Sequence, residues 1–345
     1  MPQSTHKILV IRNDKLGDFV LTFPALRLLK QAIPDLELHV LVPAYTCPIA
    51  EMNPDIDKVV LDPEPAQGWQ GIRQLVKRFR QEHYTTVITL FSTTRIGLAC
   101  WLSRIPQRIA PATKLAQVFY NHRVLQRRSH SEKPEYVYNS DLARAYLRLL
   151  QLKVGTETHG PYLRIPEAVR TDLRQRFYAQ HAIPTDHTLI FIHPGSGGSA
   201  VNLTLTQFAQ LANSIHCPVA CTIVISCAPA EEQQARKLAE QLTVAHVVYV
   251  SSEGLQRFVE HINLAGLFIS GSTGPLHIAG ALNRPTAGFY PNRRSATPLR
   301  WQTLSSDDRR LAFSPPQGAQ AEDMSSIDVM GAARAISQLL VTLAN

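Results

Sequence analysis

Short, continuous runs of apolar residues alternate with amphipathic segments in the first part of the chain. Apolar runs that polar residues do not interrupt are typical of strands buried on both faces of a parallel sheet. They predict strands at residues 7–12, 36–42, 58–61 and 85–90. Apolar positions at helical spacing predict helices at residues 19–32, 45–51 and 73–82. This alternation of strands and helices predicts a doubly wound parallel α/β sheet.

The same alternation starts again after residues 155–166, a segment that contains Gly and Pro and has little periodicity. The second series predicts strands at residues 189–193, 221–226 and 267–270 and helices at residues 205–214 and 230–241. A final helix is predicted at residues 327–343. We therefore expect two Rossmann-like domains, residues 1–165 and 166–325, and a terminal helical segment, residues 326–345.

Composition and charge narrow the range of partners. The chain has 345 residues, of which 45% are hydrophobic and 18% charged, a balance typical of globular proteins and unlike that of disordered ones. Lysine and arginine number 35 against 27 acidic residues, so the net charge is +8. This excess favours a nucleic acid, an anionic membrane or a phosphorylated small molecule as partner. The basic residues are scattered and lack interleaved aromatic residues, so we expect no nucleic-acid partner.

Cysteine and histidine usage indicates a reduced compartment and no metal. The five cysteines contain no C-x-x-C pair, and the 13 histidines show no H-E-x-x-H or other zinc-site spacing. The first residues do not resemble a signal peptide, and no apolar stretch approaches the ~20 residues that span a bilayer. We expect a cytoplasmic protein that is either free or peripherally attached to the inner membrane.

The loop at residues 13–18 connects a predicted strand to a predicted helix and lies at the sheet edge where open α/β folds bind ligands. Gly17 permits a tight turn, and Asp18 stands where the helix begins. One interpretation makes Asp18 an N-cap, which would accept a backbone hydrogen bond. The other makes it a general base toward an alcohol. The sequence pattern leaves both open.

Two further loops of small residues follow predicted strands. The first contains Gly195, Ser196 and Gly197, and the second contains Ser272, Thr273 and Gly274, with His277 near the start of the next helix. Small residues bring backbone N–H groups close to an anion such as a diphosphate. The alternatives are ordinary connecting loops and a hydrogen-bonded structural histidine. Three such loops at strand ends favour an anionic ligand the size of a nucleotide.

Several ordered motifs resemble glycosyltransferase family 9, the group that includes the ADP-heptose:lipopolysaccharide heptosyltransferases. The first strand leads into R-x-x-x-x-G-D at residues 12–18, T-x-P-A-L at residues 22–26 and N-P-D-I-D at residues 53–57. H-P-G-S at residues 193–196 and G-S-T-G-P-L-H-I-A at residues 271–279 are similar to the two donor-site loops of the family. A nicotinamide-dependent dehydrogenase is disfavoured because the chain lacks G-x-G-x-x-G.

The resemblance implies a GT-B architecture, in which two Rossmann-like domains face a central cleft. Residues 1–165 would bind the acceptor, residues 166–325 would bind the nucleotide sugar, and residues 326–345 would pack back on the first domain. The donor would be an ADP-linked sugar, namely ADP-heptose, and the acceptor would be a lipid-linked or phosphorylated glycan of the lipopolysaccharide core or a related glycan. Neither a cofactor nor a metal is expected.

The same resemblance assigns roles to single residues. Asp18 would be the base of an inverting transfer, and Arg12 and Lys15 would bind the acceptor. Glu231 matches an acidic residue near the donor ribose, although an acid in the first turn of a helix also stabilises the helix dipole. The donor-binding residues would be Gly195, Ser196, Gly197, Glu231, Ser272, Thr273, Gly274 and His277.

Two positions depart from the family pattern. Ser272 stands where the family usually carries aspartate, and Val201 stands where many members carry lysine. A lost lysine removes positive charge from the departing diphosphate. Arg293 or Arg294 could replace that charge. Otherwise the chain uses another donor, or it is a degenerate GT-B protein that binds nucleotide sugar or glycan without catalysis.

Overall fold

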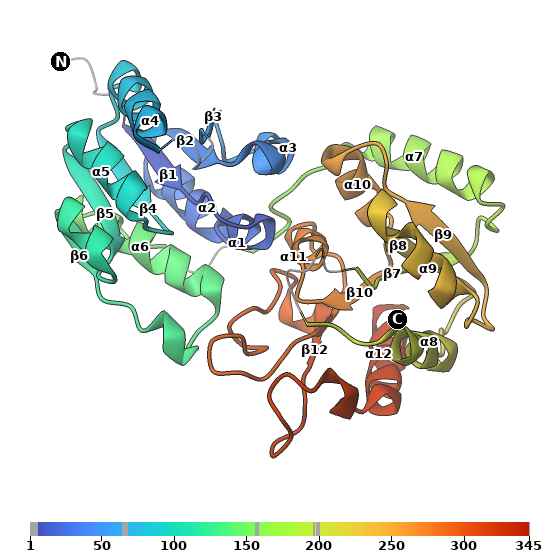
Figure 1. Ribbon diagram of the computed structural model, residues 1–345. Coiled ribbons are helices and arrows are strands. Elements are labelled where there is room, and N and C mark those ends of the chain that lie inside the picture. The colour runs from blue at the N-terminus through green and yellow to red at the C-terminus, as the bar shows by residue number, and fades with distance from the viewer. Residues whose placement is uncertain (1–5, 64–67, 156–158, 196, 198–200, 345) are drawn as a thin grey trace. The chain divides into compact units, whose positions relative to one another are not determined.

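The computed structural model describes residues 6–63, 68–155, 159–195, 197 and 201–344, and they form two units, each built on one sheet (Figure 1). The first unit contains Met1–Arg128 and Glu132–Tyr162, and the second contains Ser129–Ser131 and Leu163–Asn345. The division between Tyr162 and Leu163 lies close to the boundary at residue 165 that the sequence predicts. No helix in the described ranges is both long and apolar enough to cross a membrane.

The first unit has a six-stranded parallel sheet in the order β3-β2-β1-β4-β5-β6. Its strands are β1 (Lys7–Ile11), β2 (Glu37–Val42), β3 (Lys58–Leu61), β4 (Thr86–Thr89), β5 (Gln107–Pro111) and β6 (His122–Val124). Its α-helices are α1 (Leu16–Val20), α2 (Phe23–Ala32), α3 (Cys47–Glu51), α4 (Gly68–Glu82), α5 (Thr94–Leu102) and α6 (Glu135–Leu149). Short 3₁₀ helices are η1 (Ala44–Thr46), η3 (Leu115–Phe119) and η4 (Arg128–His130).

The second unit repeats this strand order as β9-β8-β7-β10-β11-β12, again with every pair parallel. Its strands are β7 (Thr188–His193), β8 (Cys221–Cys227), β9 (His246–Val250), β10 (Leu267–Gly271), β11 (Thr286–Phe289) and β12 (Arg310–Phe313). Its α-helices are α7 (Glu167–Gln180), α8 (Leu205–Ser214), α9 (Glu232–Ala239), α10 (Leu255–Ile262), α11 (Gly274–Ala281) and α12 (Val329–Ala344). Its 3₁₀ helices are η5 (Pro229–Glu231), η6 (Asp307–Arg309) and η7 (Met324–Ser326). The prediction of two doubly wound parallel α/β sheets is confirmed.

Both faces of each sheet are buried, as the continuous apolar runs predict. In the first unit, Leu9 and Ile11 of β1 share a core with residues of α4 and α5, while the alternating Ile8 and Val10 are buried on the other face. In the second unit, Ile190 and Ile192 of β7 pack against α8, α9 and α12. The alternating Phe191 stacks between Phe177 of α7 and Phe268 of β10, with ring centroids 6.3 and 6.2 Å away.

Two details differ from the sequence prediction. The single helix expected at residues 19–32 is divided into α1 and α2. Pro24 has no backbone N–H, so it cannot donate the hydrogen bond that would continue a helix across this point. The hydroxyl of Thr22 donates instead to the carbonyl of Phe19 (2.6 Å). The terminal helix was expected to pack back on the first domain. Its buried residues Ile336 and Leu340 join the core of the second unit beside α8, a contact that the sequence does not predict.

Candidate active site

In both sheets the chain order reverses beside the first strand, and ligands of open α/β folds bind where the strand order reverses. In the first unit this point lies between β1 and β4, and residues 13–18 follow β1 directly. In the second unit it lies between β7 and β10. The two loops of small residues that the sequence singles out follow these two strands, so each unit presents its candidate residues at a ligand-binding edge.

Arg12 is the centre of a charged cluster at the end of β1. Its side chain is only 3% exposed, and its guanidinium meets three carboxylates. Nε donates to Asp14 (2.8 Å), one terminal nitrogen donates to Asp18, and the other donates to Glu135 (3.1 Å). Burial opposes the charge, but the three carboxylates hold the pKa of Arg12 above its ordinary value. Arg12 is therefore a fixed cation that orients the carboxylates around it.

Asp18 is not the N-cap of its helix. The N-cap position of α1 belongs to Lys15, and no side chain caps this helix end. The carboxylate of Asp18 turns instead toward Arg12 and is 14% exposed. Burial raises the pKa of Asp18, Arg12 lowers it, and the charges of Asp14 and Glu135 raise it further, to about 6. The carboxylate is ionised at neutral pH and has a higher proton affinity than an ordinary aspartate, as a general base requires.

Glu135 and Asn139 of α6 hold Arg12 from a distant part of the sequence. Glu135 is 1% exposed and also accepts a hydrogen bond from Arg128 (2.7 Å). The side-chain oxygen of Asn139 accepts from Arg12 (3.3 Å), while its amide nitrogen donates to the carbonyl of Leu21 (3.0 Å). Sequence analysis missed both residues, because Glu135 lies 123 residues after Arg12 and no local motif connects them.

Two cations flank the ring of Phe91, which follows β4 at the same edge of the sheet. The guanidinium carbon of Arg12 lies 5.8 Å and the ammonium of Lys114 lies 5.1 Å from the ring centroid. Both Lys114 and the predicted acceptor-binding residue Lys15 are exposed. Tyr45 donates its hydroxyl to the backbone carbonyl of Asp14. Sequence analysis missed Phe91, Lys114 and Tyr45. Prediction of strand β5 would have placed Lys114 at this edge, because Lys114 follows the carboxyl end of that strand.

In the second unit, Glu231 lies against the glycine loop that follows β7. Its carboxylate accepts hydrogen bonds from the backbone N–H groups of Gly197 (3.2 Å) and Ala228 (3.4 Å). A Cβ atom at Gly195 would overlap this carboxylate, so the close approach requires glycine there. Ser196 lies outside the described residues. The structure thus brings together Gly195, Gly197 and Glu231, which the sequence assigned to one donor site.

Polar side chains join the carboxyl ends of β7 and β10 and the loops that follow them. Ser270 donates its hydroxyl to the carbonyl of His193 (2.8 Å) and lies 3.1 Å from the hydroxyl of Thr273. Asn202 donates to the carbonyl of Pro194 (2.9 Å), and its side-chain oxygen would be 2.6 Å from a Cβ atom at Gly271. These contacts fix the edge from which α11 begins.

Thr273 is the N-cap residue of α11, Gly274 is its first residue, and Ser272 lies just before them, half-buried. His277 follows in the first turn and is 3% exposed. Its Nδ1 atom is buried and has no hydrogen-bond partner among the described residues. Burial lowers the pKa of His277 to about 4, so the ring is neutral at pH 7. The alternative of a hydrogen-bonded structural histidine therefore does not hold at Nδ1, where a ligand group can supply the missing partner.

The arginines proposed to replace a missing lysine lie in an exposed turn after β11. Arg293 donates to Glu322 (2.8 Å), and its side chain is 58% exposed. The backbone carbonyl of Arg294 accepts from Ser131 (2.6 Å), and the side chain of Arg294 is exposed. Val201 is 41% exposed. Arg293 would have to exchange Glu322 for a diphosphate in order to act on the donor.

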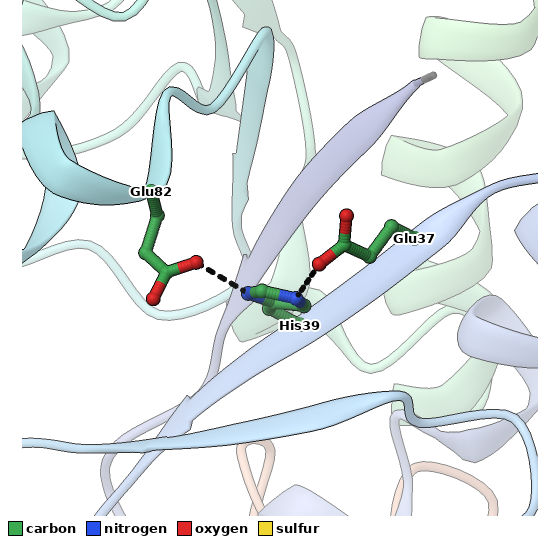
Figure 2. A group of neighbouring side chains, drawn as sticks. All are labelled: Glu37, His39 and Glu82. Carbon is green, nitrogen blue, oxygen red and sulfur yellow. Dashed lines mark hydrogen bonds and ion pairs between the residues drawn. The ribbon is translucent and has the colours of Figure 1, made fainter.

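Glu37, His39 and Glu82 form a separate group at the amino ends of β1 and β2, the edge opposite Asp18 (Figure 2). The group offers two carboxylates and one imidazole as possible metal ligands, but both ring nitrogens of His39 already have partners. His39 binds Glu37 through Nε2 (2.8 Å) and the hydroxyl of Tyr84 through Nδ1 (2.9 Å). Lys7 contacts both glutamates, at 3.0 and 3.3 Å, and Lys58 pairs with Glu82. This arrangement is an ion-pair cluster that joins β1, β2, β3 and α4.

Comparison with known proteins identifies relatives of the whole chain. Residues 72–325 match the family described as glycosyltransferase family 9 (heptosyltransferase). A protein of Haemophilus influenzae named putative glycosyltransferase is 41% identical over 94% of each chain. Lipooligosaccharide heptosyltransferase 2 of the same organism is 22% identical over 84% of this chain and 85% of its own.

Solved structures share the fold. A family 9 glycosyl transferase of Veillonella parvula has a TM-score of 0.80 at 19% identity and covers 99% of both chains. The ADP-heptose lipopolysaccharide heptosyltransferase II of E. coli has a TM-score of 0.76 at 18% identity, over 98% of this chain and all of its own (100%). The E. coli heptosyltransferase WaaC, solved with ADP-2-deoxy-2-fluoro heptose, has a TM-score of 0.65 at 18% identity, over 98% and 99% of the chains. The two parallel sheets are thus those of a GT-B fold, and the chain belongs to glycosyltransferase family 9, the heptosyltransferase family.

Proposed function

We propose that the protein transfers a heptose from an ADP-linked donor to a lipopolysaccharide core or related glycan, with inversion at the anomeric carbon and without a metal. The observation that carries this proposal is the buried carboxylate of Asp18, ionised at neutral pH and oriented by Arg12 at the edge where the strand order reverses. Family membership and the ADP-heptose named for structures of similar fold support the choice of donor.

In the proposed reaction, Asp18 accepts the proton of an acceptor hydroxyl while the hydroxyl oxygen attacks the anomeric carbon. The bond from that carbon to the diphosphate breaks, and the nucleoside diphosphate leaves with the bonding electrons. Arg12 does not contact the acceptor in this proposal, because its guanidinium is buried and engaged by carboxylates. We propose instead that it positions Asp18.

The donor would be held by the second unit. The start of α11, where Ser272 and Gly274 are half-buried, would bind the diphosphate, since the N-terminus of a helix attracts anions. His277 Nδ1, which is buried and has no hydrogen-bond partner in the described part of the chain, would meet a polar group of the nucleotide sugar. Glu231 would accept hydroxyl groups of the ribose, and binding there would compete with its present hydrogen bond from Gly197.

The acceptor would be anionic and lipid-linked. Lys15 lies in the loop before Asp18, and Lys114 contacts the ring of Phe91, which also lies beside Arg12. These groups would offer the acceptor positive charge and one aromatic surface. Next to Lys114, the 3₁₀ helix η3 exposes Leu115 (84%) and Val118 (67%), which suits contact with the cytoplasmic face of an anionic membrane. Sedimentation with anionic lipid vesicles tests the membrane contact, and a protein that stays in the supernatant contradicts it.

The decisive experiment is to incubate the protein with a panel of nucleotide sugars, with and without lipopolysaccharide core acceptors, and to measure release of the nucleoside diphosphate. We expect release that depends on acceptor, is greatest with ADP-heptose and persists in a chelator. Release with another nucleotide sugar alone would refute the donor. Loss of release in the chelator would refute metal independence.

A second candidate is a protein that binds nucleotide sugar without turnover. It is favoured by Val201, where a lysine is missing, and by the pairing of Arg293 with Glu322. Saturable nucleotide-sugar binding without any acceptor-dependent release across the panel would support this candidate over the enzyme.

A further inference from the structure

Two cysteines of the second unit lie side by side at the amino end of its sheet. Cys217 lies in the connection between α8 and β8, and Cys221 is the first residue of β8, opposite Thr188 at the start of β7. Both are half-buried against the core of the unit. The donor loops follow the carboxyl ends of the strands, so this pair lies at the opposite edge and takes no part in the proposed transfer.

The sulfur atoms of the pair are only slightly farther apart than those of a disulfide. The Cys217 thiol donates a hydrogen bond to the sulfur of Cys221, and the two sulfur atoms are 2.7 Å apart. A disulfide joins its sulfur atoms at about 2.05 Å, so they need to approach by only ~0.7 Å. The connection is also anchored next to Cys217, where the backbone N–H of His216 donates to the hydroxyl of Ser337 in α12 (2.9 Å).

The hydrogen bond gives the two thiols different chemistry. The Cys217 thiol lowers the pKa of Cys221 to about 7, against the opposing effect of burial. The same hydrogen bond and burial raise the pKa of Cys217. Because the thiolate is the nucleophile, Cys221 is the attacking residue and Cys217 the resolving one.

The other cysteines differ from this pair in their thiol contacts, in their thiol pKa or in their burial. Cys47 is half-buried like the pair, but its thiol donates to a carboxylate oxygen of Glu51 (3.3 Å), and burial together with Glu51 raises its pKa to about 11. Cys100 and Cys227 are fully buried (0% exposed). Cys47 therefore serves as an internal control. It is a partly exposed thiol whose hydrogen bond goes to a carboxylate and not to another sulfur atom.

We propose that Cys217 and Cys221 are a redox-active dithiol that exchanges with small-molecule disulfides such as oxidised glutathione. The Cys221 thiolate attacks one sulfur of the disulfide, forms a mixed disulfide and releases one glutathione thiolate. Cys217 then loses its proton, attacks the sulfur of Cys221 and releases the second glutathione. The protein dithiol is oxidised by two electrons to an intramolecular disulfide, and one oxidised glutathione is reduced to two thiols.

The test exposes the full-length protein to oxidised glutathione, then blocks free thiols with iodoacetamide and maps them by mass spectrometry. We expect a product that has lost two hydrogen atoms and is protected at Cys217 and Cys221, while Cys47 remains alkylated. A stable glutathione adduct on the wild-type protein, or free Cys217 and Cys221 at a time when Cys47 has already exchanged, would overturn the proposal.

Variants separate the two roles. Cys217→Ser should stop at a glutathione adduct on Cys221, and Cys221→Ser should leave Cys217 no more reactive than Cys47. Cys47→Ser is the matched control and should form the disulfide at the wild-type rate. If a variant fails to fold, the wild-type protein still decides: initial alkylation of Cys221 should level off above about pH 7, whereas that of Cys47 should keep rising. Equal pH profiles would refute the assignment.

Discussion

Replacing Asp18 by asparagine tests the proposed base with little change in shape. The amide oxygen can still accept from Arg12, but the side chain can no longer take a proton from the acceptor. Loss of a general base costs about 10²- to 10⁴-fold in rate, or roughly 3–5 kcal/mol in the activation barrier. We expect kcat to fall by this factor and the affinity for the nucleotide sugar to change little, because the donor is assigned to the second unit.

Asp18→Asn should lower kcat but should not lower the free energy of unfolding. The pKa of Asp18 is raised from 3.8 to about 6, so its ionised form is about 3 kcal/mol less favourable in the folded than in the unfolded chain. Asparagine removes this buried charge. At pH 8, where wild-type Asp18 is ionised in both states, the variant should therefore be at least as stable toward urea. Between about pH 6 and pH 4 the folded wild-type protein takes up the proton, gains stability and loses this disadvantage.

Asp14 provides the matched control. It binds the same guanidinium and is 16% exposed, against 14% for Asp18. The charge of Asp14 raises the pKa of Asp18, so Asp14→Asn should lower that pKa and shift the acid limb of kcat from about pH 6 toward lower pH. We expect Asp14→Asn to reduce kcat at pH 8 by less than about tenfold, because it leaves the proposed base in place.

The assay follows release of the nucleoside diphosphate at saturating donor and acceptor between pH 5 and pH 9, with urea unfolding at the same pH values. If Asp18 only fixes Arg12, the two variants should lose similar amounts of activity. Equal losses in both variants, or near-normal kcat in Asp18→Asn, would refute the assignment of Asp18 as the base.

Three further predictions, two of them with a second variant for comparison, test the binding residues. His277→Phe keeps the ring but removes the unpartnered Nδ1, so calorimetry should show roughly tenfold weaker donor binding with undiminished thermal stability, and unchanged affinity would exclude the contact. Lys114→Gln should raise the acceptor KM by about tenfold with little change in kcat. The control Lys77→Gln, on α4, should change neither constant. Equal effects of the two variants would show that Lys114 acts only through the overall charge of the protein and not through a specific contact. If Arg293 leaves Glu322 to bind the diphosphate, Arg293→Gln should lower kcat more than it lowers donor affinity, and Glu322→Gln should raise kcat. No effect of either variant would show that this turn is only a solvated surface turn.

The parts of the fold that the sequence predicts are those with local signals. The apolar runs of β1, β2, β7 and β10 are buried on both faces, so they contrast with their polar flanks and are readily found. Sequence analysis missed strands β5, β6, β9 and β12. These strands contain few consecutive apolar residues or lie at or near a sheet edge. The break between α1 and α2 was also missed, since the apolar periodicity of residues 19–32 continues across it.

The site shows the same division between local and long-range information. Asp18 and the glycine loops follow strands, so strand prediction alone places them at ligand-binding edges. The contacts of Glu231 with Gly197 and of Asn202 with Pro194 depend on how neighbouring loops pack. Whether Cys217 and Cys221 meet depends in turn on the path of the connection between α8 and β8, which composition does not reveal.

The arrangement around Arg12 also explains why a carboxylate so close to a cation keeps a high proton affinity. The cluster contains two positive charges, Arg12 and Arg128, and three negative charges, Asp14, Asp18 and Glu135. With Asp18 ionised, these five side chains carry one net negative charge in a largely buried place, which is costly. In the proposed reaction Asp18 would accept a proton from the acceptor, and the cluster would then become neutral. A single exposed arginine–aspartate pair would instead hold the aspartate ionised and weaken it as a base. Burial first, and then the additional carboxylates of Asp14 and Glu135, raise the pKa of Asp18 toward the range that the proposed proton transfer needs.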